Sequence, residues 1–333
     1  MRRVLVFAAL FVGSIALTTP CAGAQAPSLR VIEVRGDEPG PTVAFVAGVH
    51  GGKVSASRAL ERLAKRLEQQ KGRLNGRVRI VPVANEAARR SGLAQTSPDG
   101  LNLNRVFPGK SAGRPTERLA ARILYEVVAG SDYLVDMHGS DGEEAVGSFA
   151  YAARPGVKPA IDSAALDLAR AWGTPRVVWD SDGPRTLATS QFLQTAAHIS
   201  GVPAITVFES GTKSDSDDAV EAFLRGAERV LGELDMIVLE PEPMPPPAIH
   251  SARAVTLAPS AGVWTPAAGL RPGARVARDD ELGVLADSSS LPVTLVTLRA
   301  VTDGVVLHLR RAEAGNVAAN TPLVILAVGQ GTR

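Results

Sequence analysis

The chain contains very little cysteine and few aromatic residues. Cys21 is the only cysteine among 333 residues, and phenylalanine, tryptophan and tyrosine together make up 4% of the chain. A disulfide needs two cysteines, and a cysteine-ligated zinc site needs several. The sequence therefore excludes both within one chain, so any metal would have to be bound by histidine and carboxylate side chains.

Several function classes are excluded by other absences. The formal charge is only +2, and no run of lysine and arginine is interleaved with aromatic residues. Nucleic-acid-binding domains normally carry such a basic stripe, so we predict no nucleic-acid partner. No G-x-S-x-G nucleophile elbow is present, which argues against a serine hydrolase. No G-x-G-x-x-G follows the first predicted strands, which argues against dinucleotide binding.

The only long apolar run lies at the N-terminus. Arginines at positions 2 and 3 are followed by an apolar stretch over 4–17 and by Ala-Gly-Ala at 22–24, the pattern of a cleaved signal peptide. This stretch is shorter than the roughly 20 residues of a membrane-spanning helix. We predict that residues 1–24 are a signal peptide. The mature chain would then be exported, periplasmic or secreted, with no stable membrane span and no thiol.

From residue 28 to about 236, short β-branched runs alternate with amphipathic helical patterns. This alternation predicts an α/β domain over 25–238, with a sheet flanked by helices on both faces. The strands are expected at 29–34, 43–49, 78–83, 133–137, 148–152, 176–179 and 204–208. Helices are expected at 55–70, at 116–128 and from 215 to 231.

A proline-rich segment at 239–250 predicts a stiff linker. Beyond it, over 251–333, short strands are broken by glycine and proline without a long helix, which predicts a C-terminal all-β domain. Strands are expected at 255–257, 262–264, 274–276, 282–285, 293–301 and 304–309. Two of them begin with Gly-Val, which hints at a duplicated half.

Two of the five histidines end apolar strands beside glycine. His50 stands in Val-His-Gly-Gly, and His138 stands in Asp-Met-His-Gly. A catalytic zinc takes three protein ligands and leaves one position for water, so these two histidines are candidate ligands. We interpret the other three, His198, His250 and His308, as structural.

The remaining candidates are a carboxylate and a loop pair. Glu209 directly follows the apolar strand Pro-Ala-Ile-Thr-Val-Phe, at the sheet edge where open α/β folds bind ligands. A carboxylate there is suited to act as a base on water. Asn104 and Arg105 lie in a glycine- and proline-bounded loop, where an arginine can capture a substrate carboxylate with two hydrogen bonds.

Taken together, these motifs resemble those of the succinylglutamate desuccinylase and aspartoacylase family, a branch of the zinc carboxypeptidase clan. The similarity spans roughly 41–211, and Asn-Leu-Asn-Arg-Val-Phe-Pro-Gly at 102–109 is its most specific piece. The resemblance implies a zinc-carboxypeptidase-like mixed sheet flanked by helices, with the β domain as the family's C-terminal module. It also implies zinc-dependent hydrolysis of the amide bond of an N-acyl amino acid or peptide. His50 and His138 would be zinc ligands, Glu209 the base, and Asn104 and Arg105 the groups that orient the substrate.

The chain departs from the family pattern in three places. Lys53 replaces the acidic ligand of the H-x-x-E motif, and a protonated ammonium has no lone pair for a metal. Asn102 replaces an aspartate before Leu-Asn-Arg. A further arginine expected near 93–98 is missing, and Arg89 or Arg90 would have to substitute for it.

The missing ligand leaves three hypotheses open. In the first, another carboxylate replaces it: Asp136, which strand alternation puts on the same face as His138, or Asp141, Glu143 or Glu144 in the following loop. In the second, Glu209 is itself a ligand and is lost as a base. In the third, the domain binds no metal and serves as a ligand-binding module.

Overall fold

A computed structural model describes residues 28–52, 54–93, 99–140, 143–210, 216–240, 242–287 and 293–329. The predicted signal peptide, Lys53 and Asp141 lie outside these ranges. Among the described residues, no helix is both long and apolar enough to cross a membrane.

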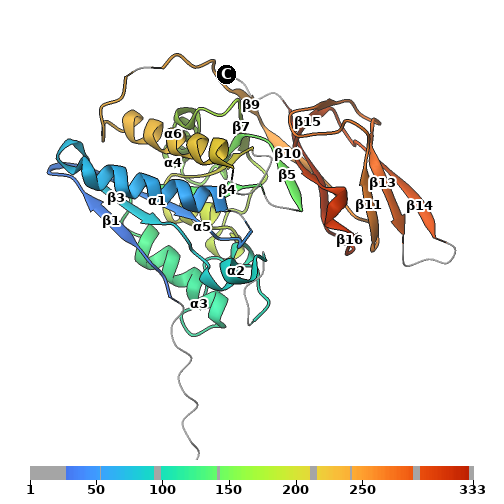
Figure 1. Ribbon diagram of the computed structural model, residues 1–333, viewed down its shortest axis with the longest axis horizontal. Helices are drawn as coiled ribbons and strands as arrows, with labels where there is room; N and C mark the ends of the chain where they lie inside the picture. Colours follow the sequence, from blue (N-terminus) through green and yellow to red (C-terminus); the bar gives the residue numbers. More distant parts are fainter. Residues whose placement is uncertain are drawn as a thin grey trace, which may run out of the picture.

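The N-terminal domain is built on an eight-stranded mixed sheet with the order β1-β3-β2-β4-β8-β6-β7-β9 (Figure 1). Strands β3, β2, β4 and β8 run parallel, so the carboxyl ends of β2, β4 and β8 meet at one edge. The bounds are β1 Ile32–Arg35, β2 Glu38–Ala47, β3 Asn75–Val81, β4 Tyr133–Gly139, β6 Phe149–Ala153, β7 Arg176–Asp180, β8 Ala204–Glu209 and β9 Ala248–His250.

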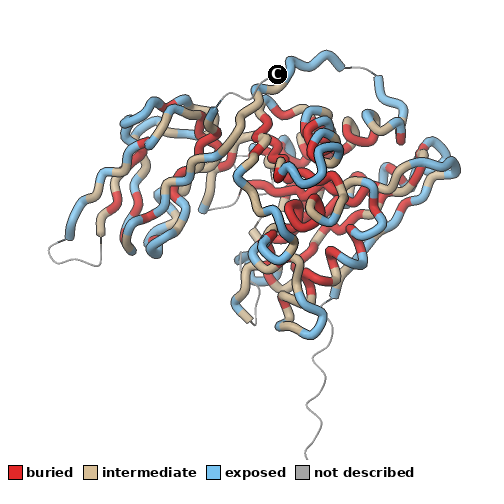
Figure 2. Tube along the Cα trace, turned by 180° about the vertical axis from the view of Figure 1, so that it is seen from behind, coloured by how far each residue is buried: buried red, intermediate tan, exposed pale blue. Residues whose placement is uncertain are grey.

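Helices cover both faces of this sheet, and the central strands are buried between them (Figure 2). One face packs against α1 (Val54–Gln69), α4 (Pro159–Trp172) and α6 (Asp217–Glu233). The other packs against α3 (Pro115–Arg122), the π-helical η3 (Ile123–Val128) and α5 (Leu193–Ser200). This arrangement confirms the predicted α/β fold. A strand that is buried on both faces needs a continuous apolar run, and residues 43–47 of β2 form one.

The C-terminal domain consists of antiparallel strands and confirms the predicted all-β fold. One sheet has the order β10-β17-β15-β12, with β5 added to β15, and the other has the order β14-β13-β11-β16. The two strands that begin with Gly-Val, β11 and β15, lie in different sheets. The bounds are β5 Glu144–Val146, β10 Ala252–Leu257, β11 Gly262–Pro266, β12 Arg275–Val276, β13 Glu281–Asp287, β14 Thr294–Arg299, β15 Gly304–Arg310, β16 Asn316–Val317 and β17 Pro322–Val328.

The two domains are joined by more than the proline-rich segment. Strand β5, which precedes the linker by about ninety residues of sequence, pairs with β15 of the C-terminal domain. At the end of the predicted linker, β9 pairs in parallel with β7 and extends the main sheet. Hence residues 248–250 are part of the N-terminal sheet, and β10 follows them directly into the second domain.

Candidate active site

A tight glycine turn positions His50 at the carboxyl end of β2. Gly48 has a positive φ of 68°, and a Cβ at Gly51 would lie 1.8 Å from the carbonyl oxygen of Ala88. Only glycine tolerates such a close approach without a shift of the backbone. The turn that leads the chain from β2 into α1 therefore requires glycine at positions 48 and 51.

The structure brings the two predicted ligand histidines together. The ring centroids of His50 and His138 lie 5.3 Å apart, with the ring planes at 74°. His138 is buried near the end of β4, and Asp136 Oδ1 accepts a hydrogen bond from its Nε2 at 3.0 Å. His50 Nε2 lies 3.3 Å from Asn102 Oδ1. The acceptor on Nε2 of His138 leaves Nδ1 as the nitrogen with a lone pair for a metal.

The described donor set matches a zinc site only in part. Imidazole nitrogens are preferred zinc donors, and a carboxylate behind one of them is the usual orienting partner. However, no group of three or more histidine, cysteine, aspartate or glutamate side chains suited to a metal occurs within the described ranges. Asp136 Oδ1 is engaged by His138, while its buried Oδ2 has no hydrogen-bond partner among these residues. The described residues thus offer two candidate donors, His50 and His138, where a catalytic zinc takes three protein ligands.

Asn104 and Arg105 lie side by side in η2 (Leu103–Arg105) but have different surroundings. Asn104 is buried, and its Oδ1 accepts a hydrogen bond of 3.0 Å from the backbone N–H of Leu193 at the start of α5. Arg105 is exposed, and its guanidinium lies 4.8 Å from the centroid of the Phe192 ring. Neighbouring protein desolvates this guanidinium and lowers the pKa of Arg105, whereas Glu144 opposes the shift. Arg105 is therefore the member of the pair that can reach a ligand.

Glu209 ends β8, the strand that pairs with β4 and His138, but its carboxylate is directed elsewhere. In the register of β4 with β8, Phe208 is opposite His138 and Glu209 is opposite Gly139. The Phe208 ring lies 5.5 Å from that of His138, and successive strand residues point to opposite faces. Glu209 Oε1 accepts a hydrogen bond of 2.8 Å from Trp172 Nε1 on α4.

The environment of Glu209 shifts its ionisation. Burial raises the pKa of this carboxyl, and the hydrogen bonds from Ser148 and Trp172 and the charges of two arginines on α6 only partly offset the shift. Sequence reasoning missed Trp172, because a tryptophan 37 residues upstream on an amphipathic helix looks like ordinary core. The Asp-x-His spacing in β4, by contrast, predicted that Asp136 lies on the face of His138, and the two side chains form a hydrogen bond.

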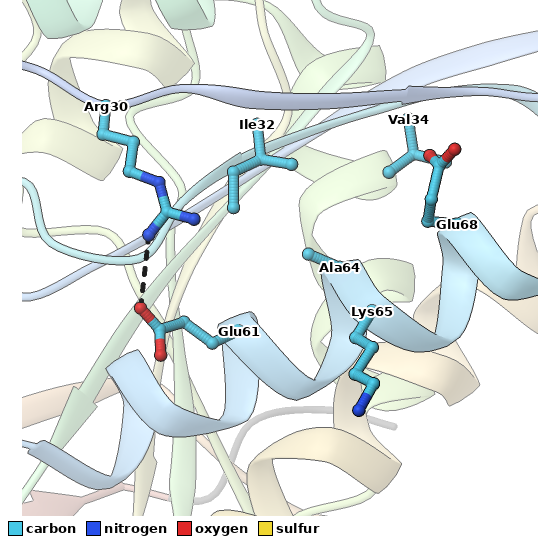
Figure 3. Close-up of a pocket in the computed structure, with 7 residues that line it drawn as sticks. All are labelled: Arg30, Ile32, Val34, Glu61, Ala64, Lys65 and Glu68. Carbon is cyan, nitrogen blue, oxygen red and sulfur yellow. Dashed lines mark hydrogen bonds and ion pairs between the residues drawn. The ribbon is translucent and has the colours of Figure 1, made fainter.

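A separate surface groove lies between β1 and α1 (Figure 3) and has a volume of about 360 Å³. Arg30 and Glu61 form an ion pair of 3.4 Å across it, and both side chains are more than half exposed. Strand β1 is at the edge of the sheet, separated from β4 by β3 and β2. This groove is therefore not part of the histidine site.

Comparisons with known proteins agree with this architecture. A family model described as the succinylglutamate desuccinylase/aspartoacylase catalytic domain matches residues 39–233. N-alpha-acetyl-L-2,4-diaminobutyric acid deacetylase of Halomonas elongata is 34% identical over 140 residues. That match covers 42% of this chain and 40% of the relative, so the chain matches less than half the length of the deacetylase.

Two solved structures share the fold over almost the whole chain. A succinylglutamate desuccinylase/aspartoacylase from Rhodobacter sphaeroides has a TM-score of 0.76 at 22% identity, with 90% of this chain and 88% of the other covered. The product-bound ectoine utilization protein EutE (DoeB) from Ruegeria pomeroyi has a TM-score of 0.76 at 23% identity, with the same coverage. Since the family model covers more than half of the sequence, the chain belongs to the succinylglutamate desuccinylase/aspartoacylase family.

Proposed function

We propose that this chain is an exported, zinc-dependent deacylase that hydrolyses the amide bond of a small N-acyl amino acid or peptide. The family and the Halomonas elongata relative point to amide-bond deacylation. The observation that carries the proposal is the close approach of the His50 and His138 rings, together with the hydrogen bond from His138 Nε2 to Asp136. The signal-peptide pattern at 1–24 supports export.

In this proposal His50 and His138 hold the zinc ion, and Asp136 orients His138 rather than acting as the third ligand. When bound, zinc supplies Lewis-acid polarisation of the amide carbonyl. Arg105 binds the substrate carboxylate, because its guanidinium is exposed and its loop meets His50 through Asn102. Asn104 fixes the loop through its hydrogen bond to α5.

Glu209 is the proposed general base, and its raised pKa is suited to that role. A base works best when its pKa approaches the working pH, and burial shifts the Glu209 carboxyl in that direction. To reach a substrate at the histidines, the side chain has to rotate away from Trp172 Nε1. Its position as the last residue of β8 allows this rotation, since the chain leaves the sheet there.

A second candidate function is a ligand-binding module without catalysis. One observation favours it: Trp172 holds the carboxylate of Glu209, and the described residues contain no group of three or more metal donors. Such a module would retain Arg105 and bind an acylated amino acid without cleaving it.

Hydrolysis measured on the purified mature chain tests the two functions against each other. Suitable substrates are N-acetyl-L-alanine, N-acetyl-L-aspartate and N-alpha-acetyl-L-2,4-diaminobutyrate. The deacylase proposal predicts turnover that Glu209→Gln lowers by about 10²- to 10⁴-fold, the usual contribution of a general base. His138→Ala should also abolish turnover, whereas His250→Asn, on β9, should leave it unchanged. Binding without hydrolysis would refute the deacylase and support the module.

A further inference from the structure

A series of ring contacts leads from His138 to the C-terminal domain. The Phe208 ring, on β8, lies 5.5 Å from the His138 ring between centroids, with the planes tilted by 37°. Phe208 also stacks on Phe149 of β6, with centroids 4.5 Å apart and planes 11° apart. From β15 of the second domain, His308 meets Phe208 edge to face at 4.9 Å and Phe149 at 5.5 Å. The two phenylalanines therefore connect the candidate ligand histidine with a histidine of the other domain.

The backbone gives His308 a fixed place at this junction. In the register of β15, His308 is opposite Ile325 of β17 on one side and opposite Val146 of β5 on the other. Strand β5 belongs to the N-terminal part of the chain and lies beside β15 (Figure 1). It ends at Val146, and β6 begins three residues later at Phe149. The strand that pairs with His308 thus leads directly to one of the rings that His308 contacts.

His308 limits the movement of Phe208. Stacked and edge-to-face rings are the favoured arrangements of aromatic pairs, and each contributes about 0.5–1.5 kcal/mol beyond the area that it buries. Phe149 is buried and supports Phe208 from the N-terminal domain, whereas His308 supports it from the β domain. Because protein interiors are closely packed, removal of the His308 ring would let Phe208 move into the freed space.

The ring plane of His138 depends on such packing. The hydrogen bond from Nε2 to Asp136 fixes one atom of the ring. The χ2 torsion of a histidine is broad, so a single hydrogen bond leaves the plane free to turn. The His50 ring on one neighbouring strand and the Phe208 ring on the other restrict that rotation. A displaced Phe208 would therefore change the orientation of His138.

We propose that His308 is a positioning residue for His138 and acts through Phe208. The β domain then holds a histidine of the candidate site in place across the domain junction. The inference rests on the proposed function only for its effect on hydrolysis, since the effect on the His138 ring requires no turnover.

The test records the ring signals of His138 in the intact mature protein by nitrogen-15 NMR with labelled histidine. The chain has five histidines, so substitution of each by glutamine assigns every ring. His308→Leu removes the ring, His308→Phe restores one, and Phe208→Leu removes the ring in between. Ile325→Ala is the matched control, because Ile325 is opposite His308 and packs against the same interdomain cluster but has no ring.

His308→Leu should shift the His138 ring signals and speed the solvent exchange of its Nε2 proton. It should also lower kcat for the N-acetyl amino acids by about 10- to 100-fold at an unchanged KM, because a misplaced catalytic group slows the chemical step. His308→Phe should restore the signals and kcat. Ile325→Ala should lower the thermal midpoint and leave both unchanged. Phe208→Leu leaves β15 intact and should shift His138 in the same direction, so it serves if His308→Leu does not fold.

The variant with both leucine substitutions should shift His138 no further than Phe208→Leu alone, because His308 acts through Phe208. Additive shifts would overturn the inference, as would unchanged His138 signals in His308→Leu or equal shifts in Ile325→Ala. Wild-type turnover in His308→Leu would overturn it and leave the deacylase standing. A protein that hydrolyses nothing, but in which His308→Leu still shifts His138 and His308→Phe restores it, would refute the deacylase and support the positioning role.

Discussion

The hydrogen bond from Trp172 to Glu209 leads to a quantitative prediction for Trp172→Phe. The indole Nε1 donates to Glu209 Oε1 at 2.8 Å, and Trp172 is 1% exposed. A hydrogen bond to a charged group contributes about 1.5–3 kcal/mol. Its loss should therefore raise the pKa of Glu209 further, because the charged carboxylate loses a donor.

The sign of the effect on stability follows from this shift. Burial already raises the pKa of Glu209 above its ordinary value of 4.5, so the folded protein binds this proton more tightly than the unfolded chain. Stability therefore falls as pH rises from the ordinary carboxyl value through the raised folded value. Trp172→Phe raises the folded value again, so the loss of stability should be about 1.5–3 kcal/mol greater at about pH 8 than at about pH 4.

Urea unfolding followed by circular dichroism at the two pH values measures this difference. Lost packing around Trp172 adds a cost that does not depend on pH and cancels in the comparison. Trp264→Phe is the matched control, because Trp264 is also 1% exposed and its Nε1 donates to the backbone carbonyl of Arg310 at 3.1 Å. Combining Trp172→Phe with Glu209→Gln should remove the pH-dependent part. The same destabilisation by Trp172→Phe at both pH values would refute the reasoning.

Three further predictions concern other buried contacts. Asp136→Asn should weaken zinc binding by about 10- to 100-fold, because the hydrogen-bond partner of His138 Nε2 is altered. Competition with a chelator measures the affinity, and an unchanged affinity would contradict an orienting role for Asp136. Burial lowers the pKa of His198 despite its hydrogen bond to Asp162, so stability should fall as the pH drops below the ordinary histidine pKa of 6.5. In urea unfolding, His198→Asn should reduce this loss of stability at low pH. A variant whose stability depends on pH as much as that of the wild type would exclude the effect. Gly226→Ala should destabilise the fold by about 1–3 kcal/mol, because the new Cβ would lie 2.3 Å from the Trp172 ring. The control Gly232→Ala should destabilise it less, because its Cβ meets the flexible end of the Leu239 side chain. Equal losses of stability would count against the packing argument.

The sequence predicts those features that depend on local pattern. The apolar runs that end at His50 and His138 predict both strands, and neighbouring parallel strands bring their carboxyl ends to one edge. For this reason the histidine pair was predictable from the chain alone. Its extra partner, Asp136, follows from the two-residue repeat of a strand.

Contacts between distant segments were not predictable in the same way. The direction of the Glu209 carboxylate depends on how α4 packs against β8, and the indole that holds it is 37 residues away. The hydrogen bond from Arg253 on β10 to Asp180 on β7 depends on how β10 docks against the first domain, and no periodic sequence pattern encodes that docking. Proline composition likewise predicted a linker over 239–250, and the pairing of β9 with β7 appears only in the tertiary structure.

The zinc content of the purified mature protein is the most direct test of a metal-dependent deacylase at His50 and His138. Elemental analysis should find about one equivalent of zinc per chain, as a catalytic zinc site requires, and His50→Ala and His138→Ala should each abolish it. Sub-stoichiometric zinc in the native protein, with zinc binding gained only after Lys53→Glu, would contradict the account.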